Sequence, residues 1–407
     1  MKVVASTVLN RNMEMLRFLI TVLFLSLTQG FSVNPQLVRG SPRRLQLSTK
    51  PISSTSPPKS ISYGEESRKF RRTIYSHDDW VKHRSPNRFL RNVMSIAKSG
   101  IYKNISNEAV AVTFVATFLV VWNTTVQKEV LSGPFTALTF PMTAFTLSSS
   151  SLGLLLGFRT NQAYKRWDEA RKNWGLNINR TRDLVRMASC FYDKAGVSDQ
   201  KRRSDLKHLS LCTWAFVRAM KRHLSPVEDE VDFKKELHEK LQEHQAENII
   251  KAVHRPNRAL HDLSMAIEAL PMHFLRRNEL HAALTVFENT LGGSERLLTS
   301  PIPLFYTRHT ARSLSLWLVL LPFGLYSSFA NTWNHIGLIP ATAAISVFLL
   351  GIDELATQME EPFTILPMQG FCDKIGKWCN EIVSWEDGDN GLTTRAPSDR
   401  HSSVHLD

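Results

Sequence analysis

The segment that most restricts the fold is residues 135–158, which contain no charged side chain and end abruptly in Gly157-Phe158-Arg159. An uncharged apolar run of this length predicts a helix that crosses a bilayer. The chain continues as RTNQAYKRWDEAR, a charged stretch with the spacing of a soluble helix. The sequence therefore places a membrane helix directly before a soluble one, and Pro141 is expected to kink the membrane part.

Three other apolar stretches have the length of a membrane span, and they give four predicted spans in all, at about residues 107–127, 135–158, 305–329 and 335–355. The polar region 159–304 shows helical spacing without strand alternation. Prolines and the Gly196 turn divide it into expected helices at roughly 160–195, 203–224, 231–254, 257–270 and 272–298. The sequence predicts an all-α membrane protein with four transmembrane helices and a helical bundle outside the membrane.

Basic residues are distributed unevenly around these spans. They are abundant in residues 68–103 and in the segment between spans two and three, whereas the two short connecting loops hold only Lys128. The positive-inside rule then puts both termini and residues 159–304 on one side, equivalent to the cytoplasm or to the stroma of a plastid.

The N-terminus reads as a targeting sequence. Residues 16–27 form a short apolar core with the length of a secretory signal, and residues 31–75 are rich in Ser, Thr, Pro, Arg and Lys, as in a transit peptide. A signal peptide (1–30) followed by a transit peptide, with Phe31 at the junction, resembles the bipartite presequence of algae with secondary plastids. The flanking Gly30 and Ser32 depart from the usual alanine-flanked form. The alternative is a secretory-pathway membrane protein with a disordered basic tail.

Charge and cysteines exclude several classes of function. The net charge of +13 comes from the N-terminal quarter, since the rest of the chain is balanced. No RNA-binding aromatic motif accompanies it, so a nucleic-acid partner is not expected. The four cysteines form no C-x-x-C pair and are expected to be free thiols, with a redox bridge between Cys372 and Cys379 as the alternative.

Three residues at helical spacing mark one face of the second predicted span. Ser150, Leu154 and Phe158 follow one another at four-residue intervals, so they lie on the same side of a helix. Such a face could line an apolar constriction. Spacing alone equally fits a stripe that faces lipid or the protein core.

Three sequence blocks carry a resemblance to a known family. They are LGFRTNQAYKRWDEARKNWG, ERLLTSPIPLFYTRHTARSLSLWLVLLPFGL and DELATQMEEPF, and they occur in this order. Together they make the chain resemble the bestrophin family, closest to its bacterial and plant branch with the thylakoid chloride channels. The resemblance covers roughly residues 68–385. The predicted channel domain spans residues 76–385 and leaves 386–407 as an expected disordered tail.

The resemblance implies a homopentamer around a central anion pore that is lined by the second membrane helix of each subunit. It places the pore neck at Ser150, Leu154 and Phe158, where Ser150 departs from the usual apolar residue. Leu275 is the candidate for a second constriction. The basic residues after the neck could attract anions, with surface or intersubunit salt bridges as the alternative role; they are Arg159, Lys165 and Arg166.

Calcium is not expected to be required, and no cofactor is expected. Animal relatives carry an acidic run that holds Ca²⁺, but here Glu361-Pro362-Phe363 is followed by TILPMQG. Glu354, Glu360 and Glu361 would offer too few oxygens, since a calcium site needs six or more. The two adjacent glutamates are expected to pair with arginines of a neighbouring subunit.

The resulting expectation is a passive channel for chloride in a plastid membrane, with the thylakoid favoured, where it would tune membrane potential and proton motive force. Bicarbonate flux toward a lumenal carbonic anhydrase is the alternative. A proton-coupled transporter is disfavoured because the centres of spans one, two and four lack ionisable groups. An enzyme is disfavoured because no H-E-x-x-H, G-x-S-x-G or phosphate-loop motif is present. Four histidines on polar helices are expected to be solvated or interfacial: His254, His261, His273 and His281.

Overall fold

The structure is a computed structural model and describes residues 74–128, 136–225, 229–332 and 334–385. The predicted signal peptide, nearly all of the predicted transit peptide and the C-terminal tail lie outside these residues. Within the described residues all regular structure is helical and there is no strand. The all-α prediction is thereby confirmed.

The helices have the following bounds: α3 His77–Arg84, α4 Arg88–Met94, α5 Gly100–Asn104, α6 Ser106–Gln127, α7 Met142–Phe191, α8 Asp199–Leu224, α9 Glu230–Lys240, α10 Glu243–Lys251, α11 Arg255–Glu268, α12 Phe274–Thr299, α13 Leu304–Leu325, α14 Leu338–Glu360 and α15 Met368–Trp385. Short 3-10 turns lie at Ile96–Lys98, Tyr326–Phe329 and Pro362–Thr364.

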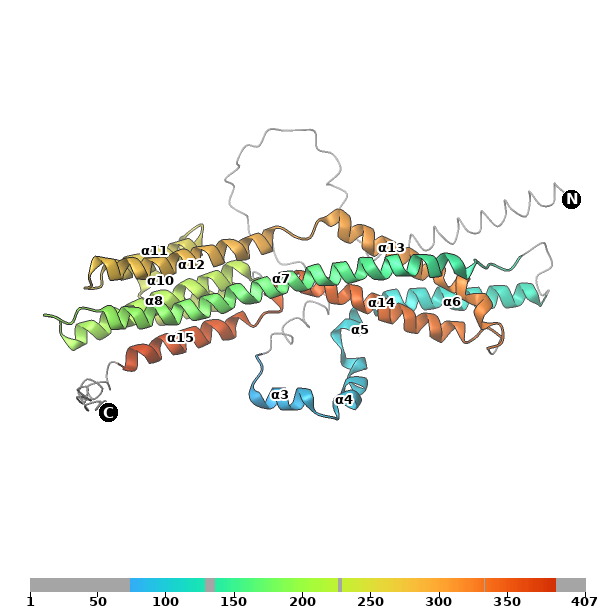
Figure 1. The fold of residues 1–407 in the computed structure, drawn as a ribbon, viewed down its shortest axis with the longest axis horizontal. Helices are drawn as coiled ribbons and strands as arrows, with labels where there is room; N and C mark the ends of the chain where they lie inside the picture. Colours follow the sequence, from blue (N-terminus) through green and yellow to red (C-terminus); the bar gives the residue numbers. More distant parts are fainter. Residues whose placement is uncertain (1–73, 129–135, 226–228, 333, 386–407) are drawn as a thin grey trace, which may run out of the picture.

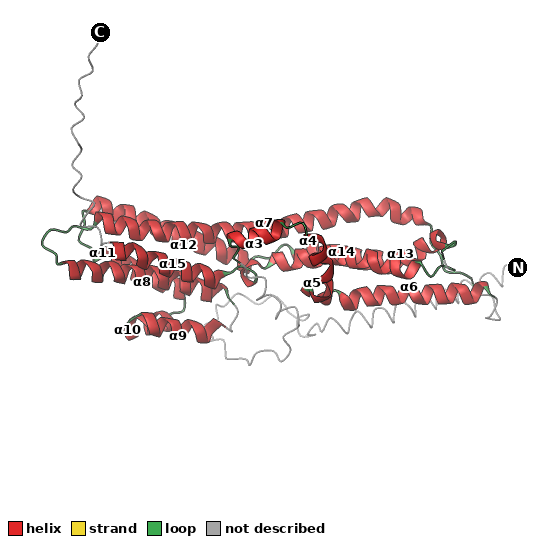
Figure 2. Cartoon of the chain, turned by 90° about the horizontal axis from the view of Figure 1, so that it is seen from below, coloured by secondary structure: helices red, strands yellow, loops and turns green. Residues whose placement is uncertain are grey.

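The molecule is an elongated bundle organised around α7, which runs along most of its length (Figure 1). At one end α7 packs against α13 and α14, and α6 packs against the same two helices. At the other end α7 packs against α8, α12 and α15, with α11 against α8. The view from below shows the same division into two helical halves along one axis (Figure 2).

The helices at the four predicted spans differ in apolarity. α6 and α14 are long and apolar enough to cross a membrane. α7 continues far beyond its apolar part, and α13 begins with the charged or polar side chains of Arg308, His309 and Arg312. Two helices thus have the length and apolarity of a span, while the four-span arrangement stays a prediction.

The expected kink at Pro141 is wrong. Pro141 is the residue before the first turn of α7, and residues 136–141 are not helical. A residue that precedes a proline is disfavoured in the helical region. Phe140, held in this extended connection, donates its backbone N–H to the carbonyl of Phe323 at 3.0 Å. From Met142 onward α7 continues to Phe191, so no boundary separates its apolar part from its charged part.

The helices outside the predicted spans follow the sequence with three differences. α8 begins earlier than expected, at Asp199, because the Ser198 side chain accepts the Lys201 N–H at 3.2 Å and caps the helix. The expected helix 231–254 is two helices, broken where Leu241 is extended. The sequence does not predict helix α15 or the short helices α3, α4 and α5. The turn at Gly196 is confirmed by its φ of +72°, which glycine adopts without steric cost.

The larger hydrophobic core lies in the half built by α8–α12 and α15. It includes the fully buried rings of Trp174, Trp214, Phe216 and Phe287.

The four cysteines are free thiols, as predicted, and all except Cys190 are buried. Burial raises the pKa of Cys372 and of Cys379 to about 12, so both thiols stay protonated and unreactive at neutral pH.

A buried group of ion pairs ties α8 to its neighbours. The Arg218 side chain is 0% exposed. It donates to Asp229 at 2.8 Å and to Glu236 at 3.0 Å, and its guanidinium lies over the Phe233 ring. Next to it, Glu230 accepts hydrogen bonds from Arg222 at 2.6 Å and from Arg255 at 2.7 Å. The charges of α8, α9 and α11 are therefore neutralised where these helices meet.

The Glu230 carboxylate should make stability dependent on pH. Hydrogen bonds from Arg255, and then from Arg222, lower the pKa of Glu230 from 4.5 to about 2. A group with a lowered folded-state pKa stabilises the protein above its unfolded pKa, and this contribution is lost as pH falls from about 4.5 toward 2. We expect Glu230→Gln to cost roughly 2–3 kcal/mol at pH 7, allowing for partial exposure.

The check is the thermal unfolding midpoint of both proteins between pH 7 and pH 3. The gap between wild type and Glu230→Gln should narrow as the pH falls. Glu239→Gln is the matched control, because Glu239 is exposed and forms only a long 3.9 Å pair with Lys235. A difference in unfolding midpoint that stays constant over this pH range would contradict the lowered pKa of Glu230.

Candidate functional site on helix α7

Helix α7 presents an exposed apolar face near the point where its sequence becomes charged. Ser150 is exposed, Leu154 is 60% exposed and Phe158 is 53% exposed. A Cβ atom added at Gly153 or Gly157 would meet nothing within 4 Å. The three predicted neck residues therefore share one face that no other part of the described chain covers.

The opposite face of the same segment is packed. Leu152 and Leu156 are buried against Leu314 and Leu318 of α13. The Tyr306 hydroxyl donates to the carbonyl of Leu155 at 3.3 Å. The core-facing interpretation of the Ser150–Phe158 stripe is thereby excluded within the chain, because the core-facing residues of α7 are other ones.

Arg159 fixes the rotation of α7 directly after Phe158. Its guanidinium pairs with Asp353 of α14 and donates to the Thr357 hydroxyl at 2.9 Å. The Arg159 side chain is only 7% exposed. Successive residues of a helix point about 100° apart, so an arginine bound to α14 holds Phe158 away from α14. Arg159 thus forms a salt bridge inside the chain, and it does not lie on the exposed face.

The other two basic residues differ from each other. Lys165 is exposed and follows the neck residues along the same side of α7. Arg166 is partly buried and donates to three backbone carbonyls near the ends of α12 and α14, which are those of Leu297, Ser300 and Glu360. A cation at these positions compensates the negative ends of both helices. Of the three candidates for anion attraction, Lys165 alone faces solvent.

The remaining candidate residues lie elsewhere. Leu275 is exposed in the first turn of α12, near the C-terminal end of α7, where the neighbouring Arg276 lies over the Phe191 ring. Glu354 accepts from the Asn104 side chain at 2.6 Å, and Glu360 accepts from the Ile302 backbone at 3.2 Å. These glutamates are not among the groups of potential metal ligands that the described residues bring together.

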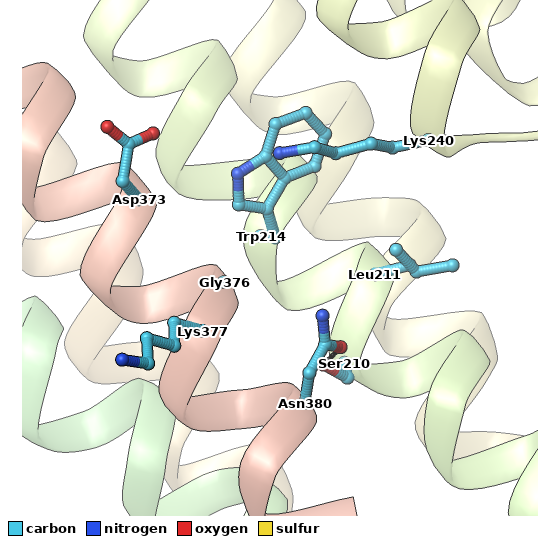
Figure 3. Close-up of a pocket in the computed structure, with 8 residues that line it drawn as sticks. All are labelled: Ser210, Leu211, Trp214, Lys240, Asp373, Gly376, Lys377 and Asn380. Atoms are coloured by element: carbon cyan, nitrogen blue, oxygen red, sulfur yellow. Dashed lines mark hydrogen bonds between the residues drawn. The ribbon is translucent and has the colours of Figure 1, made fainter.

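A pocket of about 200 Å³ lies between α8, α15 and the end of α9 (Figure 3). Two pairs of its lining residues contact each other: the Lys240 ammonium lies 4.1 Å from the centre of the Trp214 ring, and Ser210 donates to Asn380 at 2.9 Å. Gly376 allows the close approach of Trp214, since a Cβ there would lie 3.0 Å from the indole. The pocket therefore lies within the packing of α8, α9 and α15, away from the exposed face of α7.

Sequence reasoning missed the partners of the neck segment. Asp353 and Thr357 were part of the third family block, but nothing in their spacing indicated that they hold Arg159. Local spacing could not indicate this contact, because Arg159 and Asp353 lie far apart in the sequence and meet only where α7 packs against α14.

Comparison with known proteins gives consistent matches. A family model described as Bacterial/Fungal Bestrophin protein matches residues 79–381. The chain is 31% identical over 316 residues to voltage-dependent chloride channel 1, chloroplastic, of Arabidopsis thaliana, which covers 78% of this chain and 74% of that protein. It is 30% identical over 357 residues to voltage-dependent chloride channel 2, chloroplastic, of the same plant, covering 87% and 84%.

Solved structures share the fold. A bacterial bestrophin homologue from Klebsiella pneumoniae superimposes with a TM-score of 0.59 at 23% identity, over 69% of this chain and 98% of that one.

Proposed function

Because this chain belongs to the bestrophin family, we propose that it is a passive anion channel, not an enzyme, and that it conducts chloride across a plastid membrane. The observation that carries the proposal is the exposed face of α7, where Leu154 and Phe158 stand apolar and uncovered while Arg159 is held on the other side. The names of its relatives support both the ion and the plastid, since two of them are called chloroplastic chloride channels.

The proposed assembly is a homopentamer in which five copies of this face surround one axis. Cyclic symmetry turns one residue of each subunit into a complete ring. An apolar ring admits weakly hydrated anions that shed part of their water and excludes strongly hydrated ions. The positive edge of a phenyl ring can face an anion, so Phe158 suits the narrowest point. Ser150 would add a ring of hydroxyls that eases wetting at the outer end.

The proposed setting is the thylakoid membrane, with both termini and the half containing α8–α12 in the stroma. Chloride flow there would dissipate membrane potential built by proton pumping and so adjust the proton motive force. Calcium is not part of this proposal, because Glu354 and Glu360 are engaged with Asn104 and the Ile302 backbone. Lys165, exposed beyond the neck, would raise the local concentration of anions.

Purified protein in liposomes tests the function. We expect currents that reverse at the chloride equilibrium potential and do not change when a pH gradient is imposed. Replacing chloride by bicarbonate, and then by gluconate, measures the selectivity and tests the bicarbonate alternative. Empty liposomes and heat-denatured protein are the controls. Flux that follows the pH gradient, or liposomes that carry the protein and show no current, would overturn the proposal.

A further inference from the structure

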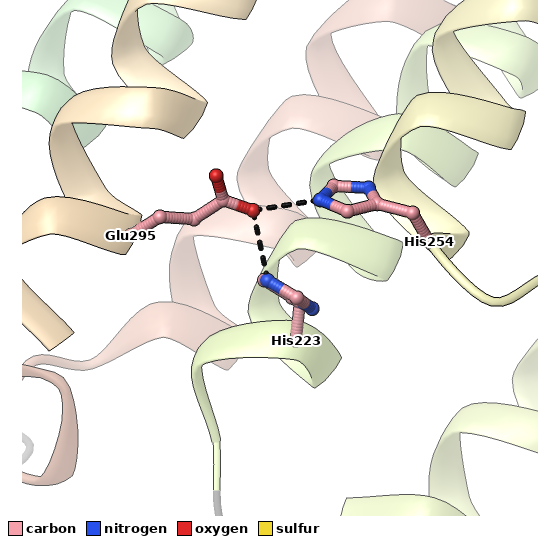
Figure 4. Close-up of side chains that lie close together, drawn as sticks. All are labelled: His223, His254 and Glu295. Atoms are coloured by element: carbon pink, nitrogen blue, oxygen red, sulfur yellow. Dashed lines mark hydrogen bonds and ion pairs between the residues drawn. The ribbon is translucent and has the colours of Figure 1, made fainter. Parts of the chain in front are cut away.

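Three helices outside the predicted spans bring two histidines and one glutamate to a single point (Figure 4). His223 lies at the end of α8, His254 is the capping residue before α11, and Glu295 lies near the end of α12. The Nε2 atoms of His223 and His254 are 2.9 and 2.8 Å from the same Glu295 oxygen, Oε1. The sequence predicts a solvated or interfacial His254, and the fold places it against Glu295 and the His223 ring, which come from distant segments.

The donor set has the chemistry of a transition-metal site. Two imidazole nitrogens and one carboxylate oxygen are ligands that zinc and related divalent ions prefer, with the remaining position open to water. With metal–ligand bonds of about 2.0–2.1 Å, the ligand atoms of a tetrahedral ion lie about 3.3 Å apart. The two distances from the histidine Nε2 atoms to the Glu295 oxygen, 2.9 and 2.8 Å, would each have to increase by only a few tenths of an ångström.

The charges around the cluster permit a cation. Two neighbouring arginines, Arg222 and Arg255, are paired with Glu230. The arginine that follows Glu295 in α12, Arg296, is paired with Glu169 at 2.5 Å. All three side chains of the cluster are partly exposed, so an ion and its water ligand can reach them.

A second group of potential ligands differs in geometry. His238 faces Glu243 with its Nδ1 atom at 3.2 Å and Glu247 with its Nε2 atom at 3.5 Å. The two nitrogens of one ring point in opposite directions, so one ion cannot use both contacts. That group offers a single imidazole and two carboxylates, one of them 78% exposed, and it therefore serves as the comparison site in the binding test.

We propose that His223, His254 and Glu295 bind a divalent cation of the zinc type, which joins the ends of α8, α11 and α12. The neutral His254 ring accepts the Asn257 N–H at Nδ1, at 3.3 Å, so its proton sits on Nε2. Metal binding at Nε2 requires that proton to move to Nδ1, and the Asn257 N–H is then left to solvent. Because unprotonated imidazole is the ligand, binding weakens at acidic pH, where protons compete with the metal.

The test uses the full-length protein in detergent, prepared without a polyhistidine tag and stripped with a chelator. Zinc chloride is titrated by calorimetry, and the thermal unfolding midpoint is measured with and without zinc. We expect one saturable site per chain with a micromolar or tighter dissociation constant, and a higher midpoint with zinc. His223→Ala and His254→Ala should each weaken binding roughly tenfold or more, whereas His238→Ala should leave it unchanged.

Two further measurements keep the result interpretable. Cobalt added to the stripped protein should give the visible absorption of a nitrogen- and oxygen-ligated ion, and Glu295→Gln should alter that spectrum. The unfolding midpoints of the stripped variants show whether each one folds. Absence of saturable binding by folded wild type, or binding that survives in folded His223→Ala and His254→Ala, would overturn the proposal. Chloride flux is not the readout, so the outcome is independent of the channel test.

Discussion

Phe158→Ala is expected to raise the chloride conductance of single channels by roughly twofold or more and to weaken discrimination among anions. Phe158 is 53% exposed on the face of α7 that no other described part of the chain covers. In a symmetric pentamer one substitution removes five phenyl rings from the same constriction. Planar bilayer recordings with chloride, bromide and bicarbonate solutions measure both effects.

Phe114→Ala is the matched control for this result. Phe114 lies on the apolar helix α6 and is 70% exposed, so the same side chain is removed from a face expected to meet lipid. Conductance should not change in that variant. If Phe158→Ala and Phe114→Ala have the same single-channel conductance, or if Phe158→Ala conducts like the wild type, the exposed stripe of α7 faces lipid and the pore lies elsewhere.

Arg218→Ala is expected to lower the free energy of unfolding by about 3–5 kcal/mol, because it leaves the partly buried Glu236 without its counter-charge and leaves Asp229 with Lys221 alone. Asp229 and Glu236 both bind the Arg218 guanidinium, whose side chain has no exposure to solvent. The thermal unfolding midpoint, followed by circular dichroism, should fall by several degrees.

Arg218→Met separates charge from packing volume. It fills most of the same space, so a loss of stability similar to that of Arg218→Ala would assign the effect to charge. Adding Glu236→Gln to Arg218→Met should recover part of the loss, since Glu236 then no longer carries an unpaired charge, whereas Asp229 still pairs with Lys221. Lys172→Ala removes an exposed pair with Asp168 and should leave the unfolding midpoint nearly unchanged, because solvent screens such pairs. An Arg218→Ala midpoint equal to that of Lys172→Ala would refute the network.

The neck face shows what local pattern can and cannot specify. The four-residue spacing of Ser150, Leu154 and Phe158 was enough to place them on one side of a helix, and the structure keeps them there. Spacing could not say whether that side met the core. The packing of Leu152 and Leu156 against α13 answered this question, because burial depends on which helices approach.

The basic residues after the neck illustrate the same limit. Arg159, Lys165 and Arg166 are equivalent in the sequence, since each is a cation in the first turns after the apolar segment. The fold gives them different environments: Arg159 binds Asp353, Arg166 binds carbonyls at two helix ends, and Lys165 faces solvent. Electrostatic roles depend on partners from distant segments, and these were not visible in local spacing.

By itself, the sequence determined the helical class, the apolar segments and the three blocks that identify the family. These properties follow from backbone periodicity and from transfer of side chains between water and apolar surroundings, which act over a few residues. The tertiary structure alone decided the unbroken course of α7, the anchoring of Arg159 and the meeting of His223, His254 and Glu295. Such contacts depend on the angles and registers at which whole helices pack, and only the folded chain sets them.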